Sequence, residues 1–264
     1  MIRLPPKARW GVAAGLLVPG LSLALTAELP MAERRSGFDF MSRDSQALQH
    51  DDTANPGMLS VLDGEMLWNS KAGTAGRSCA DCHGPALVSM KGVAARYPAY
   101  DAERRRPIDL QARIDLCREM KQNATPFARE SRELLALAAY VAHQSRGMPI
   151  TAGEDPRLQP FIERGRALYE QRHGQLNFSC ANCHDDNWGQ KLGGSVIPQA
   201  HPTGYPLYRL EWQAVGSLQR RLRNCMTGVR AEPYPFGSPE FVDLELFLMS
   251  RARGMPIETP AVRP

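Results

Sequence analysis

The 264-residue sequence predicts an all-α protein made of two similar domains in tandem. Three observations support this prediction. Apolar residues recur at helical spacing, and no clear alternation indicates strands. The second half of the chain repeats the first half at nearly constant offsets. A Cys-x-x-Cys-His run occurs once in each half, in matched surroundings.

The N-terminus has the pattern of an export signal. Three basic residues precede an apolar run that is short for a membrane anchor and is interrupted by Pro19. We therefore expect residues 1–27 to be a cleaved signal peptide. Residues 28–57 are polar, and we expect an irregular extension there, a candidate arm for a partner. After cleavage the chain has 29 Lys and Arg against 28 Asp and Glu, so its overall charge indicates neither nucleic-acid nor membrane binding.

The duplication predicts two domains, over residues 58–152 and 153–264. Positions matching at an offset of 101 are Gly64, Leu67, Trp68, Cys79, Cys82 and His83, with Gly165, Leu168, Tyr169, Cys180, Cys183 and His184. Arg113 and Cys117 match Arg221 and Cys225 at an offset of 108. The offset changes because the second copy holds about seven extra residues between its motif and Arg221. We expect this insertion to lie in a loop, where function can vary.

Each copy is expected to begin and end with a long helix. The first helices are predicted over 60–70 and 155–171, and the last over 131–145 and 238–251. Ser131 and Ser238 are suitable N-cap residues, and Pro239 suits a first helical position. Glycine and then proline follow each final helix, as is typical where a helix stops.

The two Cys-x-x-Cys-His runs have the spacing of c-type haem attachment sites. Two cysteines one helical turn apart can form thioethers to one haem, and the following histidine then becomes the proximal iron ligand. We therefore predict two covalently bound haem c groups, attached at Cys79 and Cys82 with His83, and at Cys180 and Cys183 with His184. Because c-type haem is attached outside the cytoplasm, we expect a periplasmic protein.

The ligand on the opposite face of each iron is less strongly determined. Cys117 and Cys225 occupy equivalent positions in the two copies, which favours thiolate ligation of both irons. A disulfide between them or a buried free thiol is the alternative for an exported protein. The remaining candidate ligands, for which helix-ending turns or packed side chains are simpler interpretations, are Met148, Met255, His143 and His201.

The second copy is more cationic around its extra cysteine. Arg220, Arg221 and Arg223 precede Cys225, and no acidic residue occurs from Leu218 to Ala231. On a helix Arg221 and Cys225 share one face. A guanidinium can bind an oxyanion through paired hydrogen bonds, so this pattern indicates an oxyanion of sulfur beside a sulfur nucleophile. A solvated basic helix face is the alternative.

From about residue 58 to its end, the chain resembles the SoxA family, the di-haem cytochrome c subunits of thiosulfate-oxidising SoxAX complexes. The resemblance rests on the two haem motifs, the two Arg-x-x-x-Cys elements and the Arg-Arg-Leu-Arg-Asn-Cys run at 220–225. It implies that Cys117 and Cys225 ligate the two irons, that Cys225 carries a persulfide, and that Arg221 lines the active site.

The resemblance also implies partners and a reaction. The expected partners are a smaller SoxX-like cytochrome c and a SoxYZ-like sulfur carrier. The expected reaction, that of an L-cysteine S-thiosulfotransferase, conjugates thiosulfate to a carrier cysteine and passes two electrons to cytochrome c. A periplasmic di-haem electron carrier and a di-haem peroxidase are the competing functions, but neither accounts for two symmetric surplus cysteines.

Overall fold

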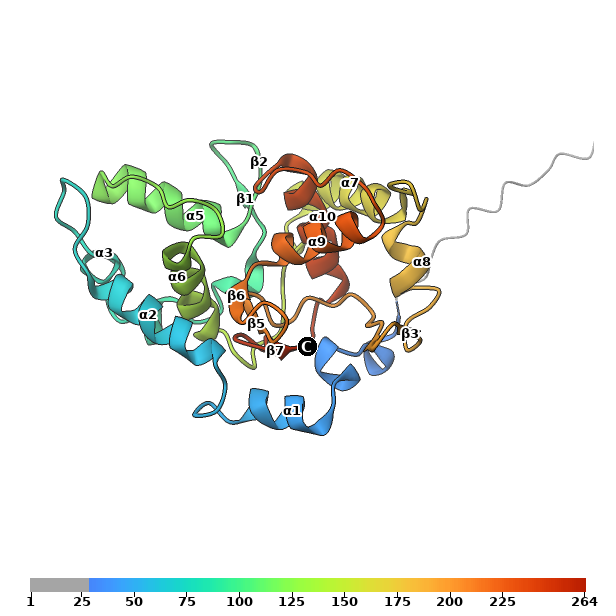
Figure 1. Ribbon diagram of the computed structural model, residues 1–264. Coiled ribbons are helices and arrows are strands. Elements are labelled where there is room, and N and C mark those ends of the chain that lie inside the picture. The colour runs from blue at the N-terminus through green and yellow to red at the C-terminus, as the bar shows by residue number, and fades with distance from the viewer. Residues whose placement is uncertain (1–28) are drawn as a thin grey trace, which may run out of the picture.

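The computed structural model describes residues 29–264, and the predicted export signal lies outside them. Helices predominate, and the chain forms two tandem helical units (Figure 1), so the predicted fold class is confirmed. The strands, which the sequence did not indicate, are all two or three residues long. None of the helices in the described part is long and apolar enough to cross a bilayer.

The first unit lies on the left of Figure 1. Its helical elements are α2 (Gly57–Asn69), α3 (Cys79–His83), α4 (Ala86–Ser89), η3 (Ala94–Arg96), α5 (Leu110–Cys117), η4 (Arg118–Gln122) and α6 (Arg132–His143). Between η3 and α5, β1 (Ala99–Asp101) and β2 (Arg106–Ile108) form an antiparallel hairpin. Ser131 caps α6 as predicted, since its side chain accepts a hydrogen bond from the Leu134 amide.

The second unit repeats this order. Its helical elements are η5 (Pro156–Leu158), α7 (Gln159–Glu170), α8 (Cys180–His184), α9 (Leu218–Gly228) and α10 (Pro239–Arg251). Its strands are β3 (Lys191–Leu192), β4 (Ser195–Val196), β5 (Leu207–Arg209), β6 (Ala214–Gly216) and β7 (Val262–Arg263). Ser238 caps α10 and Pro239 is its first residue, both as predicted. The β3–β4 hairpin lies in the predicted insertion.

Equivalent glycines bring the long helices of each unit together. A Cβ on Gly64 of α2 would lie 2.2 Å from the Ala136 carbonyl oxygen of α6. A Cβ on Gly165 of α7 would lie 2.1 Å from the Asp243 carbonyl oxygen of α10. Only glycine therefore allows these backbones to approach so closely. The duplicated glycines thus serve the same close packing in both units.

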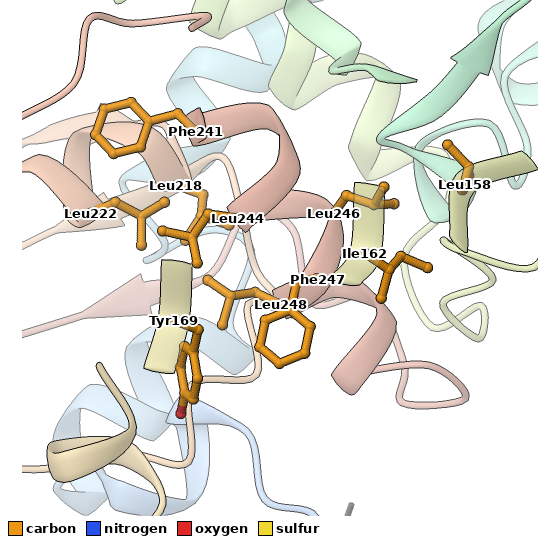
Figure 2. Packing of buried hydrophobic residues seen from close by; sticks show 10 residues of the cluster. All are labelled: Leu158, Ile162, Tyr169, Leu218, Leu222, Phe241, Leu244, Leu246, Phe247 and Leu248. Atoms are coloured by element: carbon orange, nitrogen blue, oxygen red, sulfur yellow. The ribbon is translucent and has the colours of Figure 1, made fainter. Parts of the chain in front are cut away.

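Each unit has its own apolar core. In the second unit, side chains from α7, α9 and α10 converge, as Figure 2 shows, with Tyr169, Phe241 and Phe247 the largest of them. In the first unit Trp68 and Tyr140 occupy similar positions between α2 and α6. Burial of such large side chains is the main stabilising contribution to each unit.

The two Arg-Gly-Met-Pro-Ile segments meet where the units join. The Ile150 amide donates to the Met255 carbonyl, and the Ile257 amide donates to the Met148 carbonyl, both at 2.9 Å. In each bond the isoleucine of one copy donates to the methionine of the other copy, so the junction has local two-fold symmetry. A third apolar cluster surrounds it, formed by Ala95, Ile150, Ala152, Met249, Ala252, Met255 and Ile257.

The N-terminal extension is more regular than the sequence predicted. It contains the short helices η1 (Met31–Glu33) and η2 (Gly37–Phe40), then α1 (Arg43–His50). It lies against the second unit beside β7 and the C-terminus (Figure 1). The Asn55 amide donates to the Pro260 carbonyl at 2.8 Å, and the Ser36 hydroxyl donates to Glu258 at 2.7 Å. These bonds hold the start of the described chain against its C-terminal segment.

Candidate functional site

Both Cys-x-x-Cys-His runs form one-turn helices that begin at the first cysteine and end at the histidine. Reciprocal hydrogen bonds fix each start. The Ser78 hydroxyl accepts from the Asp81 amide at 3.0 Å, and the Asp81 carboxylate accepts from the Ser78 amide at 2.8 Å. Ser179 and Asn182 make the same pair of contacts in the second unit. These capping boxes place both cysteines and the histidine on a defined turn.

In the second unit, α9 brings Cys225 against α8. Burial, with a contribution from the nearby Cys225 and Cys183 sulfurs, raises the pKa of Cys180 to about 12. Burial also raises the pKa of Cys225. A hydrogen bond from His184 and the positive charge of Arg221 outweigh that effect, so the pKa of Cys225 is lowered. Cys225 is thus the thiol of this unit whose thiolate the surroundings favour.

The His184 ring is held by the insertion. Its Nδ1 lies 2.7 Å from the Pro198 carbonyl oxygen. With Nδ1 directed at this carbonyl, Nε2 is the ring nitrogen left to face Cys225. A metal-ligating histidine is commonly oriented in this way, through its second ring nitrogen.

The first unit has the same layout around Cys117. This residue ends α5, and burial raises its pKa, with a further contribution from the nearby Cys82 sulfur. Burial likewise raises the pKa of Cys79, which also has Cys117 in its surroundings. All six cysteines are free, so no disulfide joins Cys117 to Cys225. Each surplus cysteine faces the motif of its own unit instead.

The other candidate ligands have packing partners. Met148 and Met255 belong to the two-fold junction, and Met255 is buried in the cluster there. The His201 Nδ1 lies 2.9 Å from the Arg35 carbonyl oxygen, which ties the second unit to the extension. His143 is the last residue of α6, and burial lowers its pKa.

The surroundings of the two motifs fit a haem in each unit. Leu87 and Val88, directly after α3, expose 74% and 77% of their surface, and Met120 exposes 55%. Phe178 and Leu192 are exposed beside α8. Apolar surface next to paired thiols and a histidine suits a macrocycle. Cys79, Cys82 and His83 could hold one haem, and Cys180, Cys183 and His184 the other. Cys117 and Cys225 could supply the ligands on the opposite faces.

The arginines of α9 have different surroundings. The Arg220 guanidinium stacks on the Trp212 ring, 4.4 Å from its centroid, whereas Arg223 bonds to the Tyr234 carbonyl. Arg221 lies close enough to lower the pKa of Cys225. Within residues 29–264, no hydrogen bond or ion pair joins the Arg221 guanidinium to another side chain. The structure therefore brings together Arg221 and Cys225, as predicted.

Sequence reasoning missed Arg209. This residue ends β5 after the insertion, and its positive charge also contributes to lowering the pKa of Cys225. One signal could have identified it. At the offset of 108 that relates Cys117 to Cys225, Arg209 corresponds to Asp101, which reverses the charge.

Comparisons with known proteins identify the family. The model of the SoxA/TsdA cytochrome c domain family matches residues 63–150 and 164–257. The chain is 40% identical to the L-cysteine S-thiosulfotransferase subunit SoxA of Pseudaminobacter salicylatoxidans, covering 89% of this chain and 82% of that protein. It is 34% identical to the subunit of the same name from Paracoccus pantotrophus, covering 86% and 78%.

A solved structure shows the same fold. The crystal structure of SoxXA from P. pantotrophus contains a chain that aligns with a TM-score of 0.84 and 32% sequence identity. The alignment covers 88% of this chain and 87% of that one. Two matched segments of one domain family also agree with the duplication seen in the sequence. The chain therefore belongs to the SoxA family of c-type cytochromes.

Proposed function

We propose that this protein is an L-cysteine S-thiosulfotransferase subunit that conjugates thiosulfate to a cysteine of a carrier protein. The observation that carries the proposal is that Cys225 lies near both His184 and Arg221, whose guanidinium pairs with no other side chain of residues 29–264. A sulfur nucleophile and an anion-binding group thus face one site. The names of the related SoxA subunits support the same reaction.

The chemistry balances as a two-electron oxidation. Thiosulfate binds with its sulfonate end on Arg221, and its outer sulfur approaches the sulfur on Cys225, which we propose to be a persulfide. A sulfur–sulfur bond forms, and two electrons pass to an acceptor cytochrome c. The carrier thiolate then attacks the outer sulfur and takes the thiosulfonate group, and the sulfur on Cys225 leaves as an anion. The net change is carrier thiolate plus thiosulfate to carrier S-thiosulfonate plus two electrons.

The residues of the site have separate tasks in this scheme. When bound, a haem supplies the one-electron redox chemistry through which the electrons leave. Arg221 binds and orients the sulfonate, because paired hydrogen bonds fix an oxyanion. The surroundings that lower the pKa of Cys225 favour the anionic form of its sulfur.

The wider setting follows the family. We propose two haem c groups, a periplasmic location after signal cleavage, and a heterodimer with a smaller SoxX-like cytochrome c. The likeness of this chain to a chain of the SoxXA complex from P. pantotrophus supports the heterodimer. A SoxYZ-like protein would be the carrier. The first unit lacks an equally cationic site, so we assign its haem a structural or electron-transfer role.

The Cys225→Ala variant tests the reaction. We expect transfer of thiosulfate to the carrier cysteine to fall to background, because the sulfur that forms the first bond is removed. Both covalent haems should remain. Cys117→Ala is the matched control and should retain transfer. Normal turnover by Cys225→Ala would contradict the mechanism and favour the plain electron carrier.

Mass spectrometry tests the state of Cys225 directly. Intact mass with and without a disulfide reductant should show two haem additions and one reducible extra sulfur. Peptide mapping should place that sulfur on Cys225. An extra sulfur on Cys117 instead would contradict the proposal and point to the first unit as the reactive one.

A further inference from the structure

The two units contain equivalent hairpins that differ in one charge. In the first hairpin, Asp101 of β1 lies opposite Arg106 of β2 in the strand register. In the second, Arg209 of β5 lies opposite Ala214 of β6. All three residue pairs of one hairpin correspond to those of the other at the offset of 108. The same offset relates Arg113 to Arg221. Asp101 and Arg209 are therefore structural equivalents, and the charge at this position is reversed.

In the first unit this position neutralises the arginine. The Arg113 guanidinium lies 2.7 Å from the Asp101 carboxylate, which is buried, with its side chain 5% exposed. Asp101 also accepts from the Arg104 amide at 2.8 Å. Arg113 is thus paired with a buried carboxylate, whose negative charge offsets that of the guanidinium for any anion near Cys117.

In the second unit the same position adds a positive charge. The Arg209 side chain is 13% exposed, and its Nη2 lies 3.0 Å from the exposed Glu211. Its Nε is buried without a hydrogen-bond partner among residues 29–264. Arg221 and Tyr205 lie in its electrostatic surroundings, and burial lowers the pKa of Arg209. Two partly buried like charges that are close enough to interact are unfavourable unless an anion joins them.

We infer that Arg209 is a second binding residue for the sulfur oxyanion, and that the exchange of aspartate for arginine here makes the second unit, and not the first, the thiosulfate site. This inference rests on the proposed function. The buried Nε and Arg221 would share the sulfonate, while Glu211 holds the outer edge of the Arg209 guanidinium. Both units contain the surplus cysteine and the arginine four residues before it, so this pair of residues alone does not distinguish the second unit from the first.

Binding and turnover test the role of Arg209 separately. Calorimetric titration with thiosulfate is performed on the haem-loaded Cys225→Ala protein, in which no bond to Cys225 can form. Adding Arg209→Gln should raise the dissociation constant roughly 10- to 100-fold, the effect of losing a charged hydrogen bond. Arg209→Lys should retain most of the affinity. Arg209→Asp should abolish binding, because the new carboxylate would pair with Arg221 as Asp101 pairs with Arg113.

The control is Arg220→Gln, which removes one positive charge from the same neighbourhood. Arg220 and Arg209 both lie over the Trp212 ring, but the charges that act most strongly on Cys225 are those of Arg221 and Arg209, so thiosulfate affinity should stay within about twofold in Arg220→Gln. In the otherwise wild-type protein, Arg209→Gln should raise the KM for thiosulfate by more than Arg220→Gln does. Equal affinity of Arg209→Gln and its parent, or an equal loss in Arg220→Gln, would overturn the inference. Failure of the wild-type protein to modify a carrier cysteine would reject the proposed function, and the calorimetry would still decide the role of Arg209.

Discussion

Single residues at matched positions have kept their place in the two units while their chemistry has changed. The Trp68 indole donates to the Gly84 carbonyl at 3.1 Å, whereas the matched Tyr169 hydroxyl donates to Asp185 at 2.8 Å. Asp185 in turn pairs with Arg251. An aromatic ring therefore anchors the end of the haem-motif helix in both units, through a neutral contact in one and a charged network in the other.

The buried His201 should make stability depend on pH. Burial lowers its pKa to about 4, and the Arg251 and Arg34 charges act in the same direction. The folded state therefore binds this proton less well than the unfolded state does. The free energy of unfolding should be constant above pH ~6.5 and fall, by about 3 kcal/mol at most, as pH drops towards 4. Denaturant titrations from pH 7 to 4 would measure this slope.

The His201→Asn variant should flatten that profile, since asparagine can still donate to the Arg35 carbonyl but does not titrate. Replacing the exposed His50 in the same way should leave the profile unchanged. An identical acid slope in wild type and His201→Asn would assign the loss to other groups.

Local sequence determined some site residues and left others hidden. The motif spacing marked the candidate haem-binding cysteines and histidines, because that chemistry needs two cysteines one helical turn apart. Duplication marked Cys117 and Cys225. Arg209 remained hidden because it reaches Cys225 only through the tertiary placement of a hairpin. His201 was weighed as a ligand or a packed side chain, and only the contact with Arg35 shows its place.

At the scale of helices and strands, prediction worked where the signal is local. The capped helices α6 and α10 have the expected starts, and α2 begins within three residues of the predicted position. The hairpins were missed because two- or three-residue strands are too short to show alternation. The α1 helix was missed because its stabilising contacts are with β7, more than 200 residues away.

The close helix pairs give a prediction at this scale. Gly64→Ala and Gly165→Ala should each lower the free energy of unfolding by roughly 1–3 kcal/mol, because the new methyl would overlap a backbone carbonyl that cannot move alone. Gly228→Ala is a suitable control, since a Cβ there meets nothing within 4 Å. Thermal melts monitored by circular dichroism would compare the three. A Gly165→Ala melt identical to that of wild type would show that the helices can separate without cost.

Over the whole molecule, a polar cluster connects the helices that carry the two surplus cysteines. Asp109 caps α5, which ends at Cys117, by accepting from the Ala112 amide at 2.7 Å. The Gln219 amide, near the start of α9, donates to Asp109 at 2.9 Å and to Glu245 at 3.0 Å. Sequence reasoning marked Cys117 and Cys225 but could not foresee this connection, which forms only when the two units dock.

This cluster gives the molecule a second dependence on pH, opposite in sign to that of His201. Burial and the negative charge of Asp109 raise the pKa of Glu245, and the Gln219 and Arg129 contacts only partly oppose this. Because the folded state holds the proton more tightly, the stabilisation is complete below pH ~4.5 and is lost as pH rises through the folded pKa. The Arg129 guanidinium lies 2.6 Å from the Asp109 carboxylate.

Glu245→Gln should therefore be more stable than wild type at pH 8 and similar to it near pH 4.5. The glutamine oxygen can accept from Gln219 as the protonated acid does, but it acquires no charge when the pH rises. Melting temperatures across this range would measure the difference, with Glu240→Gln, at a position on the same helix outside the cluster, as the control. A constant difference between Glu245→Gln and wild type at every pH would mean that Glu245 does not titrate in the junction. A difference that grows with pH would establish that the proton on Glu245 helps to hold the two haem-motif units together.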